Sequence, residues 1–209
     1  GKWGVNECLN SHHEHHFTNE RLNQAYQRIL NILDKVEIKG TFAFVGAFTM
    51  CMEEYRANPG WFSDVFIQGK NWFSNFNQSI KANNVDGWLN PHAFEMVLKK
   101  KSHEVASHGF SHLPLQEGLI TESTFYREME LTKLVSRLKG MEFKTFVYPK
   151  NVMGHINHLG NSGFLGYRSG VEQLPTPMHR ANNLLREFNI FDQVSLCREG
   201  FNNPFEQIH

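Results

Sequence analysis

Residues 103–112 read His-Glu-Val-Ala-Ser-His-Gly-Phe-Ser-His, and the fold is inferred outward from this stretch. Its first half suits a short buried strand, and His108 and His112 follow at the point where that strand ends. A helix over about 90–101 is expected before it, because Pro91 would stand in the first turn, where the backbone N–H that proline lacks has no partner within the helix. The stretch therefore predicts a helix–strand unit with two histidines at the carboxyl end of the strand.

The same alternation of helix and strand extends in both directions. Upstream, apolar residues at helical spacing predict a helix over 19–36, and the apolar Thr41-Phe-Ala-Phe-Val45 predicts a strand buried on both faces. The other predicted elements are a helix over 46–55, a long connection with some helix over 58–87, a helix over 121–139, a strand over 143–148, a helix over 155–162, and strands over 164–168 and 193–197. This order indicates one α/β domain over residues 1–209, with a parallel sheet or barrel and helices outside.

Composition narrows the classes of function. Lys plus Arg and Asp plus Glu both number 21, and without a basic stripe the chain is not expected to bind nucleic acid. No run approaches the roughly 18 to 20 apolar residues that span a bilayer. The 3 cysteines are widely spaced, which favours a reducing compartment and a cytoplasmic location.

Histidines four residues apart on a helical turn project from one face, so His108 and His112 are candidates to share a metal ion. Spacing alone is weak evidence, because the chain has 12 histidines and His12 with His16 forms a second such pair. For an arbitrary pair, a satisfied core or surface histidine is the more common case. The position directly after a buried strand favours the metal site at His108 and His112.

Three segments in register carry a resemblance to a known family. Residues 104–113 resemble the second signature of NodB-type polysaccharide deacetylases, whose two histidines bind a divalent metal, usually zinc. Residues 36–46 are similar to the family's second strand. Phe146-Val-Tyr-Pro-Lys-Asn151 resembles the third signature in members from surface-polysaccharide and O-antigen gene clusters, which also carry a segment like Gly163-Phe-Leu-Gly-Tyr-Arg168. The resemblance implies a distorted, incomplete (β/α) barrel of the NodB type.

The resemblance also implies a reaction, the hydrolytic removal of acetyl groups from an N-acetylated sugar in a bacterial surface polysaccharide. A metal ion polarises the acetamide carbonyl in this chemistry. By position in the third signature, the Lys150 N–H is the candidate donor to the oxyanion, and Asn151 adds a polar contact. His155 or His179 is the candidate acid for the leaving amine. Tyr148 is a candidate for substrate contact. Arg168 is expected to pair with a structural carboxylate, with substrate contact as the alternative.

The chain departs from the family pattern at its start. The aspartates of the first signature are not found, and the first strand is expected to be missing, which would leave an open sheet edge beside Thr41 to Val45. Glu7 and Glu14 are the nearest carboxylates. Val147 stands where an arginine is usual. These departures favour a rival hypothesis, a non-catalytic carbohydrate-binding or scaffold domain that retains the fold.

Two further groups have open interpretations. The stretch Ser11-His-His-Glu-His-His-Phe17 is expected to be an exposed loop, with substrate contact by one of its histidines or Glu14 as the alternative. Core packing is expected for Trp61, Trp72 and Trp88, with stacking on sugar rings as the alternative.

Overall fold

The computed structural model describes residues 1–168 and 205–207. Its helical segments are η1 (Lys2–Cys8), α1 (Ser11–His16), α2 (Asn19–Lys35), η2 (Ala47–Thr49), α3 (Met52–Ala57), η3 (Pro59–Phe62), α4 (Ser74–Lys81), α5 (Pro91–Lys99), α6 (Glu122–Leu138), η4 (Pro149–Asn151) and α7 (Ile156–Asn161). Its strands are β1 (Thr41–Phe44), β2 (Phe66–Ile67), β3 (Lys70–Asn71), β4 (Glu104–Ser107), β5 (Thr145–Val147), β6 (Gly166–Arg168) and β7 (Phe205–Gln207). No helix of the described residues is both long and apolar enough to cross a membrane.

The predicted sheet is confirmed. Its strand order is β1-β4-β5-β6-β7, in which β1, β4, β5 and β6 are parallel and β7 pairs antiparallel with β6. β1 forms one edge over the described residues, and the sheet does not close into a barrel there. The fold is thus an α/β fold of the distorted, incomplete barrel kind, and the parallel strands bring four carboxyl ends to one edge.

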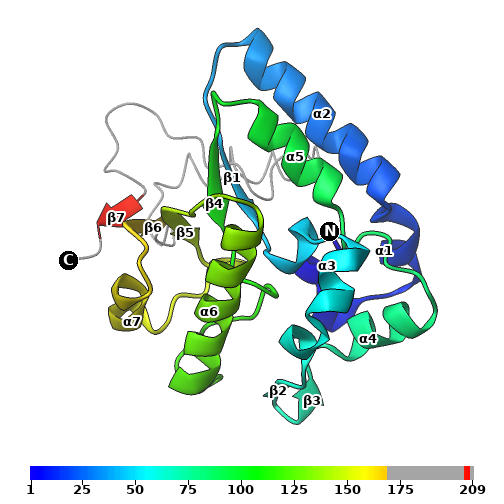
Figure 1. Cartoon of the computed structure of the whole chain (residues 1–209), viewed down its shortest axis with the longest axis vertical. Helices are drawn as coiled ribbons and strands as arrows, with labels where there is room; N and C mark the ends of the chain where they lie inside the picture. The colour runs from blue at the N-terminus through cyan, green and yellow to red at the C-terminus, as the bar shows by residue number, and fades with distance from the viewer. Residues whose placement is uncertain (169–204, 208–209) are drawn as a thin grey trace, which may run out of the picture.

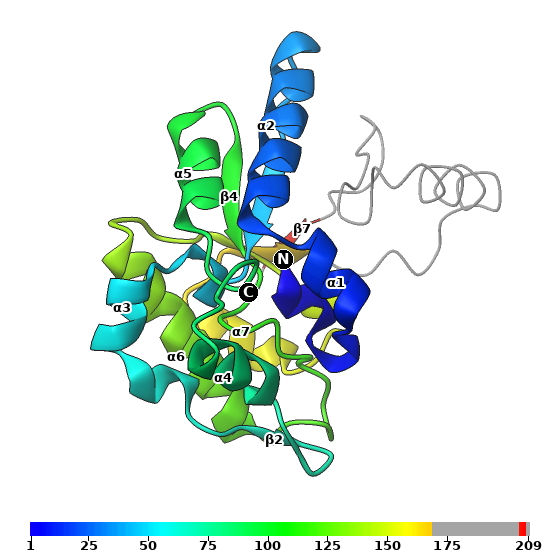
Figure 2. The same ribbon diagram turned by 90° about the vertical axis from the view of Figure 1, so that its right-hand side faces the viewer.

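The helices divide into two groups around this sheet. In Figures 1 and 2, α2 and α5 occupy the upper half of the molecule, while α3, α4, α6 and α7 lie in the lower half. Threonine and asparagine caps set where the long helices begin: the side chains of Thr18, Asn90 and Thr121 accept from the backbone N–H three residues on. One continuous core of buried apolar side chains joins both groups to the sheet.

Several local expectations need correction. The helix expected over 46–55 is split into η2 and α3, because Met50 and Cys51 adopt extended conformations between them. The long connection over 58–87 contains a hairpin, β2–β3, with Gln68 and Gly69 at positive φ in its turn. The stretch expected as a loop at 11–17 begins instead with the helix α1, capped by Asn10. The strand expected over 193–197 lies outside the described residues.

Candidate metal centre

The two histidines of residues 108–112 lie at the carboxyl edge of the sheet, as predicted, but the reason for their proximity differs. The segment is not a helical turn: it is an irregular loop, with φ of 75° at Gly109 and 60° at His112. Non-glycine residues rarely adopt such angles, so His112 is held there by its surroundings. The expectation of a helical turn is therefore wrong, although its consequence, two adjacent rings, holds.

Hydrogen bonds from three directions fix the backbone of this loop. On one side the backbone N–H groups of Gly46 and Ala47 donate to the carbonyls of Gly109 and Phe110, each at 2.8 Å. On another side the indole N–H of Trp72 donates to the Ser111 carbonyl at 3.0 Å. These bonds use the carbonyls of three successive loop residues, so the path of the chain between the two histidines is determined by the segment that follows β1 and by the segment before α4.

The third direction is that of α6, where a buried carboxylate accepts hydrogen bonds from the loop. Glu128 is 4% exposed, and its oxygens accept from the Ser111 backbone N–H at 2.6 Å and from the Ser111 hydroxyl at 3.0 and 3.2 Å. Burial raises the pKa of the Glu128 carboxyl above its usual value, and the donors of the loop oppose that shift. Sequence reasoning missed this residue, although a glutamate three residues after Phe125 and four before Thr132 stands on the apolar face of the helix.

The imidazoles of His108 and His112 lie next to each other. Their ring centroids are 4.7 Å apart at an interplanar angle of 73°, close to the roughly 5 Å expected for two imidazoles on one tetrahedral ion with bonds of ~2.0–2.1 Å. The Nδ1–H of His108 donates to the Val147 carbonyl of β5 at 2.7 Å, which leaves Nε2 with the lone pair. In His112, Nδ1 is buried without a hydrogen-bond partner.

Both rings are neutral at physiological pH. Burial lowers the pKa of His108 to about 4, and burial together with the neighbouring His108 lowers the pKa of His112 to about 3. Neutral imidazoles with one nitrogen free are the form that binds a divalent metal. The pair therefore fits a metal ion as two of its ligands, and no group of three or more His, Cys, Asp or Glu residues that could hold an ion is found in the described part of the chain.

The end of β5 lies at the same edge, since the Val147 carbonyl touches His108. The strand of the third signature therefore contacts the histidine pair through Val147. Lys150 and Asn151 both have positive φ, 59° and 55°. The Lys150 ammonium forms an ion pair with Glu7 of η1 and lies 5.9 Å from the centroid of the Trp72 ring.

The remaining candidate residues surround this edge in different ways. Arg168 donates to the side-chain oxygen of Asn151. Tyr148 is 1% exposed and its hydroxyl donates to the Gly154 carbonyl at 3.1 Å, so its ring is part of the buried core. His155 is buried and stacks on Phe125 with centroids 5.1 Å apart. The roles expected for these residues stay predictions, and His179 lies outside the described residues.

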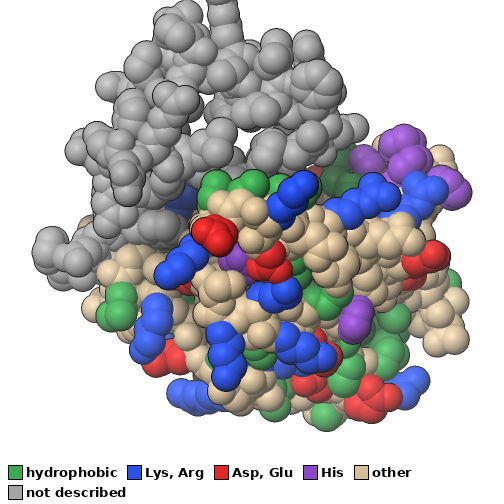
Figure 3. All heavy atoms as spheres, turned by 90° about the horizontal axis from the view of Figure 1, so that it is seen from above, with side chains coloured by type: hydrophobic (Ala, Val, Ile, Leu, Met, Phe, Trp, Pro, Cys, Tyr) green, Lys and Arg blue, Asp and Glu red, His purple; other side chains and the backbone are tan. Residues whose placement is uncertain are grey.

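The histidine-rich helix α1 lies at the surface, whereas the three tryptophans pack in or against the core. On α1 the rings of His12 and His16 stack with centroids 4.0 Å apart. Figure 3 shows a group of histidines at the right-hand edge of that view, and basic and acidic side chains are interspersed over the rest of the visible face. Glu14 pairs with the buried Lys2. Core packing is confirmed for Trp72 and Trp88, which are 5% and 0% exposed, and Trp61 is partly buried against the same core.

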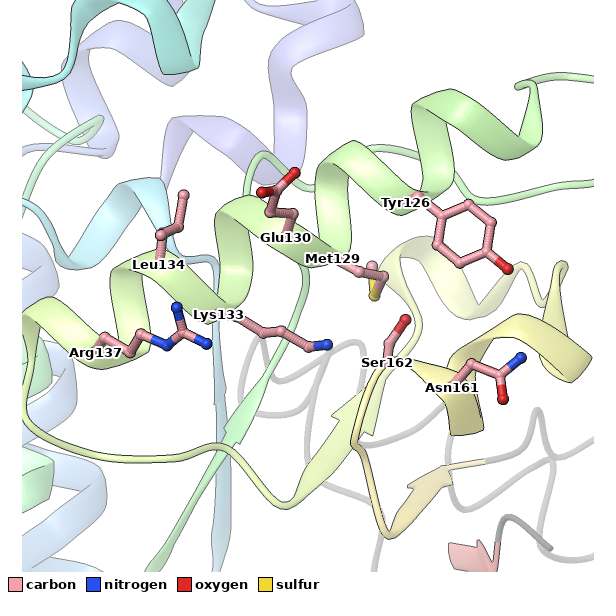
Figure 4. A pocket seen from close by; sticks show the side chains of 8 residues that line it. All are labelled: Tyr126, Met129, Glu130, Lys133, Leu134, Arg137, Asn161 and Ser162. Carbon is pink, nitrogen blue, oxygen red and sulfur yellow. The ribbon is translucent and has the colours of Figure 1, made fainter.

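A separate cavity lies away from the histidine pair. It has a volume of about 360 Å³ and opens between α6 and α7, as Figure 4 shows. It is lined by Tyr126, Met129, Glu130, Lys133, Leu134, Arg137, Asn161 and Ser162. None of the predicted site residues belongs to this lining, so the cavity is not the site that the signatures indicate.

Comparison with known proteins assigns the family. The sequence profile described as polysaccharide deacetylase matches residues 17–154. No curated protein matches the chain. Among solved structures, a CE4 family pseudoenzyme from Bacillus anthracis is similar, with 15% identity, a TM-score of 0.38, and coverage of 64% of this chain and 33% of that one. This chain thus spans about a third of the length of that protein. Because the profile match extends over more than half of the sequence, the chain belongs to the polysaccharide deacetylase family.

Proposed function

We propose that this protein is a metal-dependent hydrolase that removes acetyl groups from an N-acetylated sugar of a bacterial surface polysaccharide or its precursor. The observation that carries the proposal is the pair of buried, neutral imidazoles at the carboxyl edge of a parallel sheet, 4.7 Å apart between ring centroids. The matched family supports the class of reaction. The surface-polysaccharide part is supported by the resemblance of residues 146–151 and 163–168 to members from such gene clusters.

In this proposal His108 and His112 hold a divalent cation, zinc in most members of the family. When bound, the ion supplies Lewis-acid polarisation of the acetamide carbonyl. The ring of His108 is oriented for this task by its bond to the Val147 carbonyl, which fixes which nitrogen is free. His112 is held by the loop, whose three carbonyls are bonded to neighbouring segments.

The end of β5 supplies the polar contacts in the same scheme. The backbone N–H of Lys150 is the proposed oxyanion donor, and Arg168 holds the Asn151 amide at the edge of the site. His155 is the proposed acid for the leaving amine. Its Nε2 is buried without a hydrogen-bond partner among the described residues, which leaves this nitrogen available for the proposed proton transfer. Free thiols at Cys8 and Cys51 support the proposal of a reducing, cytoplasmic compartment.

A second candidate function is a non-catalytic carbohydrate-binding domain. The observation that favours it is the donor set: the described residues bring two imidazoles together but no third ligand, whereas catalytic zinc sites usually have three protein ligands. The two functions differ in one measurable respect, the release of acetate.

A metal titration combined with an acetate assay tests the proposal. Chelator-treated protein is titrated with zinc by calorimetry in the wild type, His108→Ala and His112→Ala, with His92→Ala on the exposed face of α5 as the control. Both site variants are expected to lose binding while the control keeps it. Zinc-dependent release of acetate from an N-acetylglucosamine oligomer supports the enzyme, and sugar binding without acetate supports the alternative. Unchanged zinc binding in both site variants would refute the metal centre.

A further inference from the structure

Glu128 stands out among the buried groups near the histidine pair. It is 4% exposed on α6, and it forms no ion pair with any described residue. It accepts from Ser111, at 2.6 Å from the backbone N–H and at 3.0 and 3.2 Å from the hydroxyl, and the backbone N–H groups of Phe110 and Leu113 also interact with it. A buried carboxylate without a cation is costly, so the loop donors are what make its position tolerable.

The contact lies at a strained part of the loop. Ser111 immediately precedes His112, whose φ is 60°, and follows the turn at Gly109, whose φ is 75°. A Cβ at Gly109 would lie 3.0 Å from Glu128 Oε1, so the carboxylate presses directly against the turn. Positive φ is strained for a non-glycine residue such as His112, and it persists only where the surroundings hold it.

We infer that Glu128 is a positioning residue that holds the His108–His112 loop in the conformation required for metal binding. The inference rests on the proposed function. The backbone N–H groups of Gly46 and Ala47 and the Trp72 indole donate to the carbonyls of residues 109–111. Glu128 instead accepts from the N–H and hydroxyl of Ser111, the residue directly before His112. Without this acceptor the N–H and hydroxyl of Ser111, which is 1% exposed, are buried without a partner. The loop must then rearrange next to His112 to satisfy them, and the ring of His112 shifts from its place beside His108.

The role differs from a general contribution to the stability of α6. Ser136 offers a matched comparison, because it is also buried on α6, at 5% exposed, but its hydroxyl donates within the helix to the Lys133 carbonyl at 3.0 Å. Loss of the Ser136 hydroxyl affects the helix and leaves the loop unchanged. Loss of the Glu128 carboxylate affects both the helix and the loop. Metal affinity therefore distinguishes a residue that positions the loop from one that only stabilises α6.

The experiment uses the full chain, freed of metal with a chelator, in buffer without urea, where each variant is folded. Zinc affinity is then measured by competition with a chromophoric chelator. Glu128→Ala is expected to weaken zinc affinity by roughly 10- to 100-fold, the usual loss for a residue that orients a ligand. Glu128→Gln is expected to retain more of the affinity, because its amide oxygen still accepts from the Ser111 N–H. Ser136→Ala is expected to match the wild type.

A second readout requires no metal. The ring-nitrogen NMR signals of His108 in the apo protein are expected to show a single Nδ1–H tautomer in the wild type and those of His112 to broaden or shift in Glu128→Ala. If Glu128→Ala does not fold, Ser111→Ala, which removes only the hydroxyl donor, is expected to show a smaller loss of the same kind. Wild-type affinity and spectra in the folded Glu128 variants, or in Ser111→Ala where those do not fold, would overturn the inference. Failure of the wild type itself to bind zinc would instead overturn the proposed function, and the inference with it.

Discussion

Replacement of Gly109 by alanine is the sharpest test of how the histidine loop is held. Gly109 has φ of 75°, a region that costs an L-residue roughly 1–2 kcal/mol. The new Cβ would also lie 3.0 Å from Glu128 Oε1, closer than ordinary contact, so the carboxylate or the loop must move by a few tenths of an ångström. The lower entropy of the unfolded chain offsets about 0.4–1 kcal/mol of this cost.

The backbone cost net of this offset is about 0–1.6 kcal/mol, and the close contact with Glu128 adds to it. The expected loss in unfolding free energy for Gly109→Ala is about 1–2 kcal/mol, which corresponds to a fall in Tm of roughly 2–8 °C for a chain of this size. Urea unfolding at neutral pH measures it. Gly118→Ala is the control, since Gly118 has φ of 79° but a Cβ there meets nothing within 4 Å. The control reports the backbone cost alone, and the excess in Gly109→Ala reports the contact with Glu128. Equal losses in the two variants would refute the claim that the loop is pressed against Glu128.

Two further predictions concern pH and the opposite side of the loop. His108 and His112 have folded-state pKa values lowered to about 4 and about 3, so the unfolded chain takes up protons first, at its ordinary value near 6.5. The stability due to the neutral rings is fully present above that value and is lost as the pH falls toward 4, at up to about 1.4 kcal/mol per pH unit for each histidine. Urea unfolding of chelator-treated protein at several pH values checks this, and a His108→Gln, His112→Gln double variant with the same slope would contradict it. Trp72→Phe leaves the buried Ser111 carbonyl without its donor and is expected to cost about 1–3 kcal/mol and to weaken zinc binding. Trp88→Phe, whose indole does not contact the loop, is expected to leave the zinc affinity unchanged, and equal effects of the two variants on zinc binding would argue against the support by Trp72.

Much of the fold follows from local patterns. The helix α6 was predictable because Phe125, Met129 and Val135 share one face and Thr121 caps its start. The strands β1 and β4 were predictable because they are short apolar runs between helices. The parallel order then followed from the alternation of helix and strand, and with it the meeting of strand ends at one edge.

The site was less predictable, since its contacts join segments far apart in the chain. The spacing of His108 and His112 suggested a helical turn, and the glycine between them was the signal for positive φ that was not used. Glu128 was overlooked because a charged residue inside an amphipathic helix is normally solvated. The helix α1 was overlooked because four histidines in five residues dominate a stretch whose Asn10 cap is a recognisable start signal.

The wide separation of the groups that hold the histidine loop also bears on how the protein folds. Trp72 and Val147 each lie 39 residues from the loop residue they contact, and the parallel pair β1–β4 joins residues 63 apart. Non-local pairings of this kind close late and slowly, because chain entropy is lost before the contacts form. The two histidines are close in sequence from the moment of synthesis, yet their arrangement exists only after the sheet and α6 have assembled. A metal ion is therefore expected to act on unfolding rather than on folding: added zinc should slow the unfolding rate and leave the refolding rate nearly unchanged.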